Sequence, residues 1–143
     1  MLAGEMSGHI FFQERWYGFD DAIYASARMI EILSNAPGTS AEVFAQLPDS
    51  INTPELGVLL EEGENLSIMG KLVAFADFSD ARITDIDGLR VDFLDGWGLV
   101  RASNTLPALT FRFEADSEKA LAHIQRQFKD LLLHVKPNIN LPF

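Results

Sequence analysis

The chain has 143 residues, 48% hydrophobic and 22% charged, which is typical of one folded domain or of one domain with part of a second. It has no cysteine, so a disulfide framework, a cysteine zinc site and a thiol nucleophile are excluded. A formal charge of −10 disfavours nucleic acid and anionic membranes as partners. No apolar run reaches the roughly 18 residues of a membrane span, and no signal peptide pattern is present, so we expect a soluble cytoplasmic protein.

One short strand and one helix are predicted in the first part of the chain. The apolar run at residues 10–12 follows a loop with two glycines and predicts a strand. Apolar residues recur at helical spacing over residues 23–33, where Asp20 is placed to cap the first turn. Pro37-Gly38 ends this helix, and residues 36–40 are the best candidate for a linker.

A helix, a strand and a second helix are predicted after the linker. The short helix runs to about residue 47 and is capped by Thr39 or Ser40. A strand follows at residues 53–60 and a helix at residues 65–78. The apolar face predicted for this helix consists of Leu66, Met69, Leu72 and Phe75.

The last third of the chain predicts a hairpin, a strand and a long helix. Asp87-Gly88 indicates a two-residue turn within a hairpin over residues 82–95. Alternation of apolar and polar residues at 109–114 predicts a half-buried strand, and the spacing at 117–135 predicts an amphipathic helix. From residue 41 on, the order is helix, strand, helix, three strands, helix. This order predicts an α+β domain with a four-stranded, mainly antiparallel sheet and helices packed on one face.

The segment between the last two strand patterns carries the richest set of polar groups. Arg101 supplies a guanidinium, Ser103 and Thr105 supply hydroxyls, and Asn104 supplies an amide. A bidentate cation and several neutral donors are the groups that bind a phosphate. Residues 81–143 are also neutral overall, so the acidic excess lies elsewhere in the chain. The same composition fits a surface turn whose polar side chains bond its own backbone.

Two motifs in this sequence resemble loops of the α-D-phosphohexomutases, and among them the bacterial phosphomannomutase/phosphoglucomutase enzymes. Residues 98–105, Gly-Leu-Val-Arg-Ala-Ser-Asn-Thr, resemble the phosphate-binding loop of the family's fourth domain. Residues 4–9, Gly-Glu-Met-Ser-Gly-His, resemble the sugar-binding loop of its third domain. The Asp87-Gly88 hairpin and the closing Leu-Pro-Phe are also similar, whereas Leu106 stands where many members carry a polar residue.

The resemblance implies a division of the chain and a fold for each part. Residues 1–38 correspond to a strand-helix remnant of the α/β third domain. Residues 39–143 correspond to the whole fourth domain, which has a fold like that of the TATA-box-binding protein. On this interpretation the domains that precede them in the family are the partners of this segment.

The resemblance also implies a function. Family members interconvert the 1- and 6-phosphates of mannose or glucose through a hexose 1,6-bisphosphate, with a phosphoserine and Mg²⁺. The substrate-binding residues it implies are Glu5 and Ser7 for the sugar hydroxyls, His9 near the reacting end, and Arg101, Ser103, Asn104 and Thr105 for the phosphate that is not transferred.

The sequence leaves two alternatives open, one for His9 and one for the function of the segment. His9 is either an acid/base or phosphate contact, or an ordinary structural histidine. Neither the phosphoserine loop nor the Asp-rich metal loop of the family is found, so the segment holds no Mg²⁺ ligands and is expected to be inactive alone. The alternative function is an isolated α+β module that binds a phosphosugar or another anion, or a protein partner, without catalysis.

Overall fold

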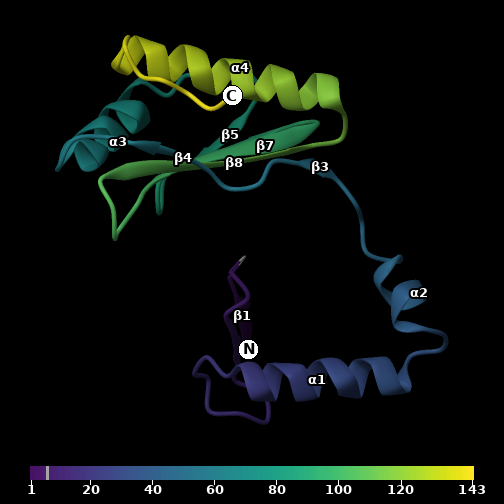
Figure 1. Ribbon diagram of the computed structural model, residues 1–143. Helices are drawn as coiled ribbons and strands as arrows, with labels where there is room; N and C mark the ends of the chain where they lie inside the picture. Colours follow the sequence, from purple (N-terminus) through teal and green to yellow (C-terminus); the bar gives the residue numbers. More distant parts are fainter. Residues whose placement is uncertain (6) are drawn as a thin grey trace. The chain divides into compact units, whose positions relative to one another are not determined.

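The chain forms two compact units, Met1–Pro48 and Asp49–Phe143. The computed structural model describes residues 1–5 and 7–143, so Met6 of the sugar-loop motif lies outside the described residues. Residues 36–40, the linker candidate of the sequence, lie within the first unit. Both units are drawn in Figure 1.

The first unit consists of a small hairpin and two helices. Strands β1 (Leu2–Gly4) and β2 (Ile10–Phe12) pair antiparallel, and α1 (Ala22–Asn35) and α2 (Ser40–Phe44) follow. Asp21 caps α1 by accepting from the Tyr24 amide at 2.9 Å, so the prediction of Asp20 as the cap is wrong. Thr39 caps α2 as predicted, in a capping box with Glu42.

The second unit is built on one antiparallel sheet. Its strand order is β3-β8-β7-β6-β5, with β4 also paired to β8. The strands are β3 (Ile51–Asn52), β4 (Leu56–Leu59), β5 (Arg82–Thr84), β6 (Leu89–Phe93), β7 (Gly96–Ala102) and β8 (Ala108–Ala115). The α+β class and the antiparallel sheet are therefore confirmed.

The predicted count of four strands is wrong, because the sheet has six. One of the additional strands arises because one edge of the sheet is divided. β3 and β4 pair with successive parts of β8, and Thr53 and Pro54 lie between them. Proline has no backbone N–H to donate, while Thr53 still donates to the Phe113 carbonyl oxygen at 3.0 Å. The edge is thus one interrupted strand rather than the single run expected at residues 53–60.

The turn prediction is also corrected. β5 ends at Thr84 and β6 begins at Leu89, so the connection that contains Asp87-Gly88 has four residues rather than two. The two-residue turn lies further along, where Phe93 pairs with Gly96.

Two helices cover one face of this sheet, as predicted (Figure 1). α3 (Glu64–Phe75) packs on β6 and β7, and α4 (Glu118–Val135) packs on β7 and β8. Phe128 of α4 is fully buried against the strand position Gly98 and meets Phe113 edge to face at 5.3 Å. The core of the fold is therefore confined to the space between this face and the two helices.

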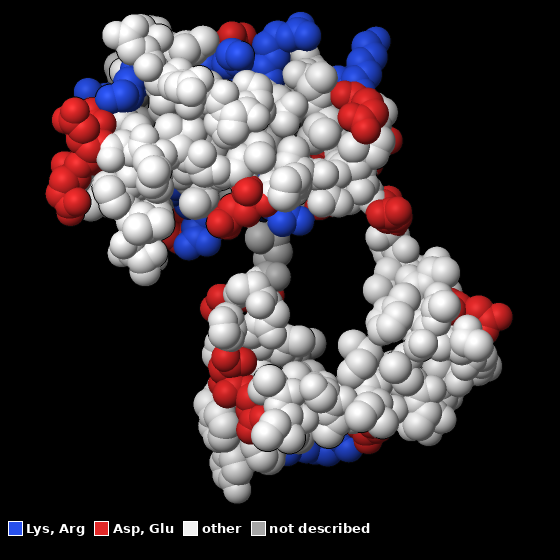
Figure 2. All heavy atoms as spheres, viewed as in Figure 1, with Lys and Arg blue, Asp and Glu red and all other residues white. Residues whose placement is uncertain are grey.

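Basic side chains are visible along α4, and acidic ones lie beside α3 (Figure 2). Among the described residues, none of the helices is both long and apolar enough to cross a membrane.

Candidate functional site

The polar loop of the sequence connects β7 to β8. Its backbone is closed by the Ser103 amide, which donates to the Ala108 carbonyl oxygen at 2.9 Å. The Ser103 hydroxyl oxygen accepts from the amides of Thr105 and Leu106 at 3.4 and 3.2 Å. Arg101 belongs to β7, so the loop proper covers residues 103–107 and is shorter than the sequence predicted.

A buried amide from another element supports this loop. Asn65 stands in the first turn of α3 and is only 8% exposed. Its Nδ2 donates to the carbonyl oxygens of Ser103 at 3.0 Å and Leu106 at 3.4 Å. Because these two bonds turn loop carbonyls toward α3, Asn65 helps to set the loop conformation. The sequence analysis missed this residue, since no motif marks an asparagine inside a helix.

The loop and the start of α3 enclose a hollow of about 330 Å³. The predicted residues Ser103, Asn104 and Thr105 all line it, together with Asn65. Asn104 and Thr105 are exposed, so their polar groups are accessible from solvent. The other lining residues are Glu62, Gly63, Leu66, Leu106 and Pro107.

Arg101 does not line that hollow and instead pairs with the hairpin between β5 and β6. Its Nη2 lies 2.7 Å from Oδ2 of Asp87. Gly88 has a positive φ of 104°, and a Cβ there would overlap the Val100 carbonyl oxygen and lie 2.8 Å from Cγ of Arg101. The turn therefore packs closely on the Arg101 side chain, an arrangement that requires glycine at position 88.

The second motif forms a turn between β1 and β2 in the first unit. The Glu5 amide donates to the His9 carbonyl oxygen at 2.8 Å, and the Ser7 hydroxyl donates to the Glu5 carboxylate at 3.1 Å. Nδ1 of His9 is hydrogen-bonded to Asp20 Oδ2, and the other oxygen of Asp20 accepts from the Ile10 amide at 3.3 Å. Glu5, Ser7 and His9 therefore share one exposed turn, as the motif predicts.

Asp20 favours the charged form of His9. The hydrogen bond to Asp20, and then the charge of its carboxylate, raise the pKa of His9 above its ordinary value of 6.5. The imidazolium form is thus favoured over a wider pH range. No sequence pattern predicts this pairing, because Asp20 and His9 are eleven residues apart.

Mg²⁺ is held by carboxylates and other oxygen ligands that lie close together. Within residues 1–5 and 7–143, no group of three or more His, Asp or Glu side chains is placed to hold a metal ion. The described residues therefore do not fit the Mg²⁺ that the sequence resemblance implies for the family.

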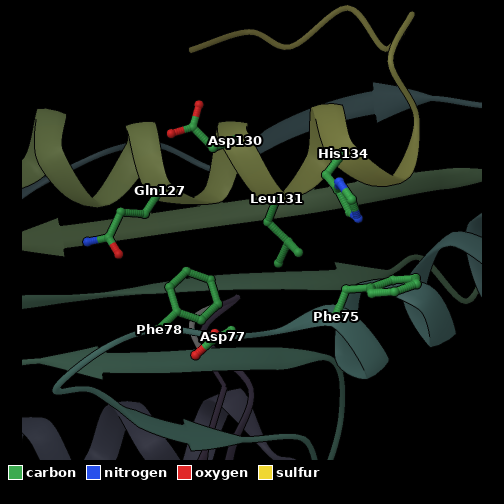
Figure 3. A pocket seen from close by; sticks show the side chains of 7 residues that line it. All are labelled: Phe75, Asp77, Phe78, Gln127, Asp130, Leu131 and His134. Atoms are coloured by element: carbon green, nitrogen blue, oxygen red, sulfur yellow. The ribbon is translucent and has the colours of Figure 1, made fainter.

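A second hollow lies between α3 and α4 (Figure 3). Its volume is about 290 Å³, and the ring of Phe75 meets that of His134 edge to face at 5.3 Å. Its lining residues are Phe75, Asp77, Phe78, Gln127, Asp130, Leu131 and His134. None of the predicted site residues lines this hollow. It is therefore distinct from the hollow beside the loop after β7.

Two family models together match most of the chain. The model of the phosphoglucomutase/phosphomannomutase C-terminal domain matches residues 55–131. The model of the phosphoglucomutase/phosphomannomutase alpha/beta/alpha domain III matches residues 1–51.

Similar proteins support the same assignment. A phosphomannomutase/phosphoglucomutase of Pseudomonas putida is 52% identical over 143 residues, covering 100% of this chain and 31% of that protein. A phosphoglucomutase of Neisseria meningitidis is 54% identical over 144 residues, covering 99% of this chain and 31% of that protein.

A solved structure agrees with these matches in both sequence and fold. The crystal structure of a phosphoglucomutase/phosphomannomutase family protein from Burkholderia thailandensis superimposes with a TM-score of 0.89 at 50% identity. The match covers 99% of this chain and 30% of that one, so the chain spans about a third of the length of these relatives. The resemblance drawn from the two loops is confirmed: the chain belongs to the phosphoglucomutase/phosphomannomutase family and corresponds to the C-terminal part of its members.

Proposed function

We propose that this chain serves as the C-terminal part of a phosphohexomutase and binds the phosphosugar rather than performing the phosphoryl transfer. In this role Arg101, Ser103, Asn104 and Thr105 anchor the phosphate that is not being transferred. The observation that carries the proposal is the Asn65-supported loop, which brings three of these four residues to one hollow in a chain of this family.

The chemistry of the loop supports phosphate as the ligand. Hydroxyl and amide groups donate hydrogen bonds to phosphate oxygens without adding charge, and a guanidinium supplies a charge-assisted bond. The Ser103 hydroxyl oxygen is already used as an acceptor by two loop amides, which leaves its hydrogen available for donation. The internal bonds of the turn and a role in binding are therefore compatible.

The exposed turn of the first unit carries groups that suit a sugar. The Glu5 carboxylate accepts hydrogen bonds, as a contact to vicinal hydroxyls requires, and Ser7 both donates and accepts. His9 is paired with Asp20, which favours a positive charge. We propose a contact to the phosphate at the reacting end for it, because an imidazolium attracts an anion.

Anchoring a distal phosphate is useful in phosphoryl transfer, which depends mainly on positioning and on electrostatic stabilisation. No described residue cluster supplies a metal site, so we expect the chain alone to bind without turning over. An isomerisation assay on the purified chain with mannose 1-phosphate tests this point, and full turnover by the chain alone would refute it.

The binding role is tested by comparing two arginine variants. Arg101→Ala removes the proposed phosphate contact, whereas Arg126→Ala removes an equal charge from the exposed surface of α4. We expect Arg101→Ala to weaken mannose 1-phosphate binding by about tenfold or more, because a charge-assisted hydrogen bond is lost. Arg126→Ala is expected to change the dissociation constant little. Equal dissociation constants for the two variants would show that the loop is not the phosphate site.

A further inference from the structure

We propose that the Asp87-Gly88 turn positions Arg101 for phosphate binding. The turn belongs to the hairpin between β5 and β6, outside the loop at residues 103–107. This inference rests on the proposed function of the loop and adds a positioning residue to it. Asp87 is not expected to touch the phosphate, since a carboxylate and a phosphate repel each other.

The first observation is the ion pair between the two side chains. Nη2 of Arg101 lies 2.7 Å from Oδ2 of Asp87. A guanidinium is a rigid plane with five N–H donors, so fixing one nitrogen restricts the directions of the others. The contact therefore limits the orientation of Arg101 while leaving donors available.

The second observation is the packing of the turn on the stem of Arg101. Gly88 lies so close that a Cβ at this position would stand 2.8 Å from Cγ of Arg101. Nε of Arg101 is buried and has no hydrogen-bond partner among the described residues. A stem held between the strand and the turn has few rotamers to lose when the ligand binds, which lowers the entropic cost of binding.

Asp87 has two effects on phosphate binding, and these effects have opposite signs. As a nearby negative charge, Asp87 weakens the attraction of this region for an anion, so its removal strengthens binding on electrostatic grounds. As a positioning group, it strengthens binding, so its removal weakens it. Only the second effect requires contact with Arg101.

The same turn offers a matched control. Asp85 carries the same charge two residues away and is exposed, and no ion pair with Arg101 is found for it in the described part of the chain. Asp85→Ala therefore reports the loss of one negative charge, whereas Asp87→Ala reports this loss together with the loss of the contact. Asp87→Asn retains an oxygen that can accept from the guanidinium and serves as the conservative variant.

The experiment measures inorganic phosphate binding and arginine side-chain order in the full chain by NMR. We expect phosphate to bind Asp87→Ala about 2- to 5-fold more weakly than Asp85→Ala, the range of an exposed ion pair. Asp87→Asn should fall between them. In the absence of phosphate, the ¹⁵N relaxation of Arg101 Nε–H should show greater mobility in Asp87→Ala but not in Asp85→Ala.

Failure of the positioning role is distinguishable from failure of the loop assignment. If the wild-type chain responds to phosphate and Arg101→Ala abolishes the response, while Asp87→Ala binds as tightly as Asp85→Ala or more tightly, the positioning role is refuted alone. Unchanged Arg101 mobility in Asp87→Ala refutes it as well. If phosphate produces no response at the loop of the wild-type chain, the proposed function fails and the positioning role fails with it.

Discussion

At the scale of single residues, Gly98 shows how the sheet accommodates the long helix. It lies in β7 facing α4, and an added Cβ would overlap the buried ring of Phe128. Gly57 in β4 is the natural comparison, since no atom lies within 4 Å of the Cβ position outside its neighbours. The packing of the core therefore requires glycine at position 98 but not at position 57.

We predict that Gly98→Ala destabilises the chain by about 1–3 kcal/mol, the usual cost of forcing extra volume into a packed core. Gly57→Ala should change the unfolding free energy by less than about 0.5 kcal/mol, as expected for an exposed site. Chemical denaturation of the two variants measures both values. Equal decreases in unfolding free energy for the two variants would show that Phe128 leaves room for a methyl group at position 98.

His9 provides a second residue-scale prediction, based on its raised pKa. Because the folded pKa is raised by Asp20, the pair stabilises the first unit below the ordinary pKa of 6.5 and loses this contribution as the pH rises through the folded pKa. An NMR titration of the His9 ring should give a pKa above 6.5 in the wild-type chain. In Asp20→Asn it should move back toward 6.5; an unchanged pKa would contradict the role of Asp20.

At the scale of elements, α3 links the proposed site to the core. Its buried side chains are Asn65, Ile68, Met69 and Leu72. Glu64 in its first turn pairs with Lys136 at the end of α4 at 2.7 Å, and this contact is the main cause of the lowered pKa of Glu64. One turn of α3 therefore contacts both the loop after β7 and the C-terminal end of α4.

We predict that Asn65→Ala lowers stability by about 1–3 kcal/mol, because two partly buried hydrogen bonds to loop carbonyls are lost. Glu64→Gln removes a partly exposed ion pair and should cost less than about 1 kcal/mol. Unfolding and phosphate titrations of both variants separate the roles. Only Asn65→Ala should also weaken phosphate binding. Unchanged phosphate binding in that variant would show that Asn65 is not needed to hold the loop in its binding conformation.

The elements also show where sequence patterns are informative. The alternation at residues 109–114 and the spacing at 117–135 predicted β8 and α4 correctly, since each has one clearly apolar face. The face of α3 was wrong: Leu66 is 70% exposed and Phe75 55% exposed. Apolar residues surround much of this helix, so spacing alone does not identify the side that meets the sheet. The role of Asn65 depends on a contact across 38 residues of sequence and has no local signal.

At the scale of the whole chain, the two units differ in how they bury their helices. α4 buries five side chains: Ala120, Leu121, Ile124, Phe128 and Leu132. α1, all of whose residues are described, has no fully buried side chain, and Ile23 and Ile30 are 85% and 66% exposed. Helices in proteins gain most of their stability from packing, so the two should differ in local stability.

We predict that hydrogen exchange is much faster in α1 than in α4. Opening α1 exposes little additional apolar surface, whereas opening α4 exposes the core of the second unit. Amide exchange of the monomeric chain, followed by NMR or mass spectrometry, measures this difference. Equal protection of residues 20–34 and 117–135 in a monomer would contradict it.

The central claim, that residues 101–105 form a phosphate site, is tested most directly by a ¹⁵N amide NMR titration with mannose 1-phosphate. Inorganic sulfate serves as the control for anion charge alone. We predict saturable shifts at Arg101 and at residues 103–105, with half-saturation at about 1 mM or below, and weaker shifts with sulfate. A titration in which these amides do not move, while the remaining resonances confirm a folded chain, would contradict the claim.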